Sequence, residues 1–211
     1  MLIEKYKIFG KICHVSTLEG AKKILEAKAR GVNVTAEIAP HHLYFSKARK
    51  DLQVNPPIRV GEENRPALVA LLREKRIDYL ATDHAPHTKE EKVAGISGMP
   101  HLDTFGPFVT WLMAEQEFTP GDIARVCSEN PGKFWHEFTG EKYGKIEKGY
   151  FGSLTIVDMN KPTTIKAENL KTKCAWSPFL GVTFPGGVAM TIIKGIPYQS
   201  KLGTGQEAHE K

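Results

Sequence analysis

Short apolar runs alternate with amphipathic segments over the first two thirds of the chain. The runs are short enough for buried strands and lie at residues 11–15, 32–38 and 77–82. The amphipathic segments predict helices, at residues 16–30, 66–73, 104–115 and from 119 onward. Alternation of this kind is typical of an α/β fold with a parallel sheet and helices outside it.

Local signals place several element boundaries. Ser16 and Glu19 have the spacing of a capping box, which predicts that the first helix begins at Ser16. Gly31 stands where a left-handed residue ends a helix. The polar stretches at 39–42 and 88–100 are predicted to be loops.

The pattern changes near residue 145. Glycine-rich turns separate short β-prone runs, notably 153–157 and 189–193, which predict a small β unit. We therefore expect three segments: a barrel-type α/β region over 1–144, a β unit over 145–198 and a polar tail over 199–211.

Composition excludes several classes of protein. The 211 residues are 41% hydrophobic and 25% charged, as in a globular domain with a core, and the net charge of +5 is spread along the chain. This spread gives no support to nucleic-acid binding. No apolar run approaches the roughly 18 residues that span a membrane. Three scattered cysteines indicate a reduced, cytoplasmic protein rather than a disulfide framework.

Two residues at predicted strand ends could carry chemistry. His14 follows the first apolar run and Asp83 follows the third. In α/β barrels the carboxyl ends of the strands form the active-site face, and imidazole with carboxylate suits a zinc-type ion. The ordinary alternatives are a hydrogen-bonded loop histidine for His14 and a helix N-cap for Asp83.

The segment that contains Asp83 is dense in polar chemistry. Asp83, His84 and His87 fall within five residues, and Pro86 restricts the backbone between them. A carboxylate and imidazoles on a rigid turn suit proton transfer beside a bound anion.

Four motifs together resemble the dihydroorotases of the amidohydrolase superfamily. They occur in the family's order, as His14-Val15-Ser16-Thr17, Thr35-Ala36-Glu37-Ile38-Ala39-Pro40-His41-His42, Asn55-Pro56-Pro57-Ile58-Arg59 and Ala81-Thr82-Asp83-His84-Ala85-Pro86-His87. The last is highly specific, and the resemblance covers roughly residues 10–195. It implies a TIM-type (β/α) barrel of which this chain holds strands six to eight.

The resemblance assigns roles to particular residues. It implies that His14 is a metal ligand and that Asp83 is both a ligand and the general acid/base. It implies substrate contacts for Asn55 and His87, with backbone groups at Ser97 and Gly98 flanking the ring. Glu37 and Cys13 lie close enough to the strand ends to join an additional metal site, and packing around the site is the favoured alternative for both. Three further histidines are His41 and His42, expected to be structural, and His101, which stands where relatives have a smaller residue.

The implied reaction is reversible hydrolysis of the cyclic amide of dihydroorotate to N-carbamoyl-aspartate, in pyrimidine synthesis. Zinc, as one or two ions per complete site, would activate water and polarise the carbonyl. Asp83 would move the proton from the water to the departing nitrogen.

Several family features are absent from this sequence. Family members have a His-x-His pair on the first strand, a carboxylated lysine or aspartate on the fourth and a histidine on the fifth. Two ligands do not fix a zinc ion that prefers four. We therefore expect this chain to be inactive alone or completed by another polypeptide.

Other functions remain open on the sequence alone. Another cyclic amidohydrolase, such as an allantoinase or hydantoinase, is the enzyme alternative. A non-catalytic dihydroorotase-like partner of aspartate transcarbamoylase is the binding alternative, and a homo-oligomer is compatible with either. An α/β domain with incidental histidines would require four motifs to arise by chance.

Overall fold

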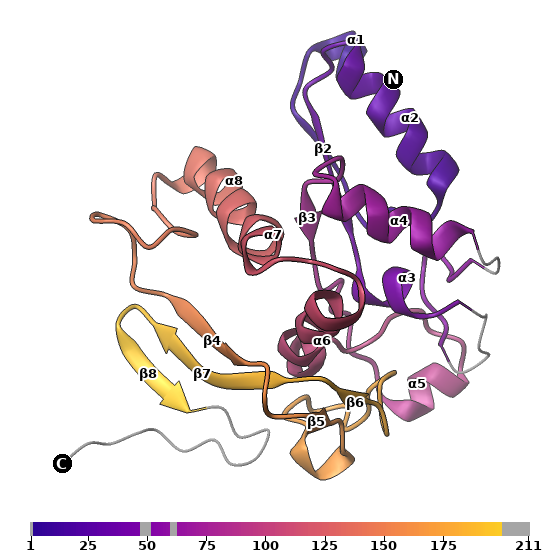
Figure 1. The fold of residues 1–211 in the computed structure, drawn as a ribbon. Helices are drawn as coiled ribbons and strands as arrows, with labels where there is room; N and C mark the ends of the chain where they lie inside the picture. The colour runs from indigo at the N-terminus through magenta and orange to yellow at the C-terminus, as the bar shows by residue number, and fades with distance from the viewer. Residues whose placement is uncertain (1, 47–51, 60–62, 200–211) are drawn as a thin grey trace. The chain divides into compact units, whose positions relative to one another are not determined.

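A computed structural model describes residues 2–46, 52–59 and 63–199 (Figure 1). The chain divides into two compact units, Met1–Met99 and Pro100–Lys211. This division differs from the predicted boundary after residue 144, because helix α6 (Leu102–Glu115) packs against strands β6 (Thr183–Phe184) and β7 (Gly187–Ile193) of the second unit. The predicted tail lies outside the described residues except for Gln199.

The first unit alternates strands and helices, which confirms the predicted α/β class. Its elements are α1 (Leu2–Tyr6), β1 (Gly10–Ile12), α2 (Leu18–Ala29), β2 (Val34–Ile38), α3 (Pro40–Tyr44), α4 (Asn64–Arg73), β3 (Tyr79–Leu80) and α5 (Lys89–Val93). In the described part of this unit, the strands form a parallel sheet in the order β1-β2-β3. The sheet is an open part of a barrel, not a closed one.

Helices α2 and α4 contact each other, and α2 also contacts β2, so both lie on one side of the sheet (Figure 1). Between helix and sheet, side chains such as Ala36, Ile38 and Leu72 are completely buried. The Asp78 carboxylate accepts hydrogen bonds from the Ala36 amide (2.8 Å) and the Lys28 ammonium (2.6 Å). The bond from Lys28 connects the C-terminal part of α2 to the segment that precedes β3.

The boundaries of α2 partly correct the prediction. Thr17, not Ser16, is the N-cap, and its hydroxyl accepts a hydrogen bond from the Gly20 amide at 3.0 Å. The Ser16 carbonyl instead accepts a hydrogen bond from Asn64 at 2.8 Å, a long-range contact that local spacing does not reveal. Gly31 has the left-handed conformation that was predicted, with φ 79°.

Two predicted loops contain short helices. Residues 40–44 form α3, which begins with Pro40 at its first position, and 89–93 form α5. The cap of α5 is a complete capping box, in which Thr88 and Glu91 each bond the other's backbone amide. Both helices span five residues, too few for a hydrophobic stripe to be visible in the sequence.

The second unit combines helices with antiparallel sheets. Along the chain follow α6, α7 (Pro120–Ala124), a π-helix (Arg125–Glu129), α8 (Asn130–Thr139), β4 (Leu154–Asp158), β5 (Thr163–Thr164), a 3₁₀ turn (Ala167–Asn169), β6, β7 and β8 (Ile196–Gln199). The described strands pair in the orders β4-β7-β8 and β5-β6. In Figure 1, β7 runs as the long strand between β4 and β8.

Aromatic side chains fill the core of the second unit. Phe108, Phe179 and Phe184 are fully buried, with ring centroids 5.4–6.3 Å apart. His101 is also fully buried, directly before α6, and its ring lies 5.7 Å from that of Phe179. Among the described residues of either unit, no helix is long and apolar enough to cross a membrane.

Candidate active site

The parallel sheet places His14 and Asp83 at the same end, where the carboxyl ends of its strands lie. Register pairs Ile12 with Ala36 and Ile38 with Leu80, so β1, β2 and β3 run in the same direction and their carboxyl ends meet. His14 follows β1 by two residues and Asp83 follows β3 by three. The ladder continues past the strands, because the Val15 amide donates to Glu37 O (2.8 Å) and the Ala81 amide to Ile38 O (3.0 Å).

His14 and Asp83 share an uncommon backbone conformation. Their φ angles are 42° and 47°, in the left-handed region that few non-glycine residues occupy. Such conformations cost free energy and persist where surrounding structure enforces them, often at functional sites. Each of the two strand ends therefore carries one residue in this costly conformation.

Electrostatics shows that several ionisable groups gather around Asp83. Burial raises the pKa of the Asp83 carboxyl, His14 opposes the shift and the Glu37 carboxylate adds to it. The Nε2 atom of His41, a fully buried side chain, lies 3.7 Å from Asp83 Oδ2. The predicted pair therefore lies in a cluster that also holds Glu37 and His41, although His41 was expected to be only structural.

Glu37 and Cys13 have contacts within the protein that need no metal. The Glu37 carboxylate forms an ion pair with the Lys11 ammonium of the adjacent strand. Burial raises the pKa of the Cys13 thiol, and the nearby Glu37 carboxylate raises it further. A thiol that holds its proton is a weaker metal ligand than a thiolate. A role for either residue as a metal ligand stays a prediction.

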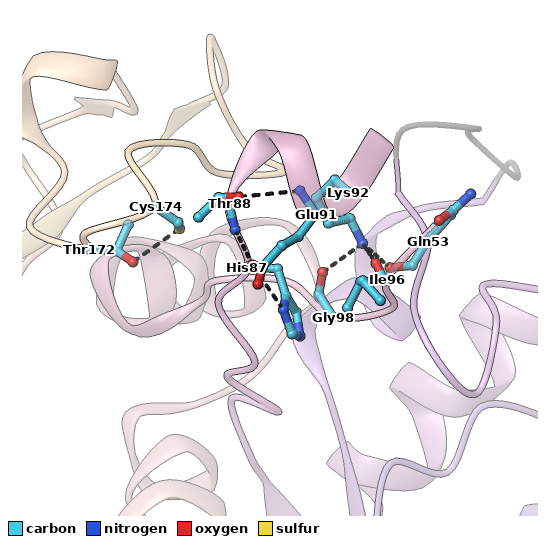
Figure 2. A network of polar contacts seen from close by, with 9 residues as sticks. All are labelled: Gln53, His87, Thr88, Glu91, Lys92, Ile96, Gly98, Thr172 and Cys174. Carbon is cyan, nitrogen blue, oxygen red and sulfur yellow. Dashed lines mark hydrogen bonds and ion pairs between the residues drawn. The ribbon is translucent and has the colours of Figure 1, made fainter. Parts of the chain in front are cut away.

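A second group of predicted residues meets beside helix α5 (Figure 2). Gly98 has φ 136°, and a Cβ built there would lie 2.6 Å from Ala85 O and 2.9 Å from His87 Cδ2. Only glycine allows this approach, which brings the Ser97–Gly98 backbone against the turn that follows Asp83. The Gly98 amide also donates to Gln53 O at 3.0 Å.

Asn55 is the fourth predicted substrate residue, and its side chain is exposed two residues beyond Gln53. Its peptide bond to Pro56 is cis, and the Pro56 carbonyl lies 3.1 Å from His42 Nε2. The structure thus brings His87 and Gly98 into contact and places Asn55 on the segment that Gly98 bonds.

Sequence reasoning missed two charged residues of α5. Glu91 Oε2 lies 3.3 Å from His87 Nδ1 and also accepts the Thr88 amide (2.8 Å). The Lys92 ammonium donates to three backbone carbonyls. The capping-box spacing of Thr88 and Glu91 could have revealed the helix, but no sequence signal marks the backbone acceptors of Lys92.

The cluster at the strand ends fits a zinc-type metal in kind. Imidazole and carboxylate are ligands that zinc accepts. Over residues 2–46, 52–59 and 63–199, however, no group of three or more histidine, cysteine, aspartate or glutamate side chains is arranged to hold an ion. His14 and Asp83 can therefore contribute to a metal site, and further ligands are needed to complete it.

A surface hollow in the second unit contains none of these residues. It is lined by side chains of α8 and the adjoining segments, Ser128 and Trp135 among them. Its lining includes Cys127, but burial raises the pKa of that thiol to about 12, so the thiol holds its proton and the strand-end cluster remains the candidate site.

Several dihydroorotases are similar to this chain in sequence. A dihydroorotase of Pyrococcus furiosus is 37% identical over 197 residues, covering 92% of this chain and 45% of the relative. A dihydroorotase of Pyrococcus horikoshii is 40% identical over 188 residues, covering 87% of this chain and 43% of the relative. The chain thus spans about half the length of the curated relatives it matches.

Solved structures of hydantoinases are similar to this chain in fold. The L-hydantoinase (dihydropyrimidinase) of Arthrobacter aurescens superposes with a TM-score of 0.85 at 25% identity, covering 95% of this chain and 47% of that enzyme. A D-hydantoinase from Thermus sp. has the same fold, with a TM-score of 0.83 at 20% identity. The sequence model of the amidohydrolase family matches residues 2–196 of this chain. With its strand-end histidine and aspartate, the chain belongs to the amidohydrolase family.

Proposed function

We propose that this chain carries part of the active site of a dihydroorotase, which reversibly hydrolyses the cyclic amide of dihydroorotate to N-carbamoyl-aspartate. The observation that supports the proposal is that the parallel strands end side by side, with His14 close enough to Asp83 to oppose the rise in the pKa of its carboxyl. Sequence identity of 37–40% to dihydroorotases supports this substrate over other cyclic amides.

His14 and Asp83 would hold a zinc-type ion, which when bound polarises the ring amide carbonyl and makes water more acidic. The carboxylate of Asp83 accepts a proton from the attacking water and delivers it to the amide nitrogen as that nitrogen departs. An amide nitrogen leaves poorly unless it is protonated, so one carboxylate serves both steps. The buried His41 beside Asp83 limits the directions in which that carboxylate can turn.

The groups beside α5 would hold the substrate. His87, fixed through Nδ1 by Glu91, is suited to meet the carboxylate of dihydroorotate. Asn55 supplies a side-chain amide that can bond the ring. The Ser97–Gly98 backbone can flank the ring because Gly98 has no side chain. These contacts hold an anionic ring by charge and by hydrogen bonds.

The complete site would take one or two zinc ions. The two ligands of this chain leave the zinc preference of four ligands unmet, so we expect no activity from the chain alone and further ligands from another part of the complete enzyme. Glu37 and Cys13 stay candidates for an additional ion, although Lys11 already neutralises Glu37.

Exchanging Asp83 for asparagine tests the assignment. In the completed, zinc-loaded enzyme, Asp83→Asn should lower turnover of dihydroorotate on the order of 10³-fold, because shape stays and proton transfer is lost. Asp158→Asn, the same exchange at the end of β4, is the control and should leave turnover unchanged. Near-normal turnover by Asp83→Asn would remove Asp83 from its role.

Hydantoin hydrolysis is the second candidate, favoured by the TM-score of 0.85 to an L-hydantoinase. The two rings differ in size and in the carboxylate that dihydroorotate carries. Turnover of dihydroorotate, hydantoin and allantoin by one preparation would separate the candidates. Loss of dihydroorotate turnover in His87→Ala with hydantoin turnover retained would support the carboxylate role of His87.

Cytoplasmic location and partners complete the proposal. Three free cysteines, Cys13, Cys127 and Cys174, suit a reducing compartment. A homo-oligomer or a complex with aspartate transcarbamoylase would be seen as a larger mass in light scattering after co-expression. A stable transcarbamoylase complex without bound metal would favour a scaffold over an enzyme.

A further inference from the structure

Lys92 makes an unusual set of contacts for a lysine on a short surface helix. Its ammonium donates hydrogen bonds to the carbonyls of Gln53 (2.6 Å), Ile96 (2.7 Å) and Gly98 (2.9 Å), as Figure 2 shows. An ammonium has three protons, so three acceptors use its full donor capacity. All three acceptors are backbone atoms, so these bonds fix the path of the chain.

The three carbonyls belong to the segments that carry the proposed substrate contacts. Gln53 lies two residues before Asn55, and Ile96 and Gly98 enclose Ser97. Lys92 itself lies on α5, which begins directly after His87 and Thr88. One cation therefore connects the segments of Asn55, of Ser97 and Gly98, and of His87.

Apolar packing does not hold helix α5 itself. No residue of α5 is buried, and Val93 is 90% exposed. A helix of five residues is also far too short to be stable by itself. Polar contacts must therefore hold α5. The bond from Lys92 to the Gln53 carbonyl reaches across to the Gln53 segment, as does the bond from the Gly98 amide to the same carbonyl.

The surroundings of Lys92 suit a permanent contact. The side chain is partly buried, and this loss of hydration lowers the pKa of its ammonium. Three carbonyl dipoles replace the lost water, and bonds from a charged donor are stronger than neutral ones. The Gln53 carbonyl that Lys92 binds also accepts a hydrogen bond from the Gly98 amide at 3.0 Å, which links the Gln53 and Gly98 segments directly.

We infer that Lys92 is a positioning residue of the substrate pocket, which holds the Gln53–Asn55 and Ile96–Gly98 segments in place through three backbone carbonyls. The inference rests on the proposed function for the identity of the substrate, and on the contacts alone for the clamp. Lys92 does not touch the reacting atoms. Its removal should therefore weaken substrate binding and leave the chemical step.

Hydrogen–deuterium exchange on the full chain tests the clamp without substrate or metal. Lys92→Met keeps the aliphatic stem and removes the three donors, so amides of residues 95–99 should exchange on the order of tenfold faster than in the unaltered chain. Amides of β2 should be unchanged. Lys89→Met, at the exposed first residue of α5, is the matched control and should behave like the unaltered chain. Equal exchange at 95–99 in Lys92→Met and Lys89→Met would overturn the clamp.

Kinetics on the completed, zinc-loaded enzyme tests the consequence. Lys92→Met should raise KM for dihydroorotate about tenfold while kcat changes less than about twofold, the pattern of lost uniform binding. An unchanged KM, or a fall in kcat alone, would overturn the positioning role. If the unaltered enzyme does not turn over dihydroorotate, the proposed function fails, and the exchange experiment still decides on the clamp.

Discussion

At the scale of single residues, His42 shows how strongly burial can lower the pKa of an imidazole. Its side chain is 3% exposed, and burial lowers its pKa from 6.5 to about 4, against the opposing effect of the Pro56 carbonyl. In the unfolded chain the ring takes up a proton near its ordinary pKa of 6.5, whereas in the folded chain it stays neutral down to about 4. Between these values, protonation favours the unfolded state.

We therefore expect the free energy of unfolding to decrease as the pH falls from 6.5 to about 4, with no further loss from His42 below that pH. The loss from this residue should reach about 3 kcal/mol. Urea unfolding across that range measures it. His42→Gln should flatten the dependence, and the exposed His136→Gln should not. The same slope in His42→Gln and in the unaltered chain would show that other groups cause it.

The sequence allowed some site residues to be predicted and not others. The placement of His14 and Asp83 at neighbouring strand ends could be predicted, because each follows an apolar run and parallel strands bring their carboxyl ends together. The pairing of Lys11 with Glu37 depends on which residues of β1 and β2 lie opposite each other, and sequence does not fix that register. Lys92 binds backbone carbonyls, which every residue has, so no residue type marks its partners.

At the scale of elements, two helical glycines differ in their surroundings. A Cβ added at Gly132 of α8 would lie 2.2 Å from the backbone oxygen of Tyr143, whereas one added at Gly121 of α7 would meet nothing closer than Thr119 Oγ1 at 3.6 Å. Alanine is favoured over glycine in helices by about 1 kcal/mol. Steric conflict with backbone costs more than that gain, because a backbone cannot rotate away.

The same substitution should therefore have opposite effects at these positions. Gly132→Ala should lower the free energy of unfolding by about 1–3 kcal/mol, and Gly121→Ala should raise it by a few tenths to about 1 kcal/mol. Chemical denaturation followed by circular dichroism measures both. If Gly132→Ala were as stable as Gly121→Ala, α8 would not pack on the Tyr143 backbone as described.

Element prediction succeeded where periodicity was long and failed where tertiary contacts decide. The stripe of α2 and the apolar residues of α4 and α6 predicted helices that the structure confirms. The predicted start of α2 at Ser16 was wrong, because Thr17 is the N-cap and the helix begins at Leu18, while the Ser16 carbonyl bonds Asn64. Helix α3 was predicted to be a loop because its five residues depend on burial of Pro40, His41 and Leu43 against neighbouring elements.

At the scale of the whole molecule, the first unit presents an incomplete sheet. In the described residues, β1 and β3 each pair with β2 and with no other strand, so both are edge strands of the sheet. The family fold was predictable from four motifs, since each marks a strand end or a turn. The division into two units was not, because it depends on the packing of α6 on β6 and β7, which the sequence pattern of that helix does not reveal.

The metal content of the chain follows from the same incompleteness. His14 and Asp83 supply two ligands, and no described group of three or more side chains surrounds an ion position. Since a tightly held zinc ion has about four ligands, the purified chain alone should retain well under one zinc ion after dialysis. Elemental analysis by mass spectrometry measures this, with His14→Ala expected to abolish what remains. Two tightly bound ions per chain would show instead that these residues, together with Glu37 and Cys13, form a complete metal centre. The expectation that the chain alone is inactive would then be wrong.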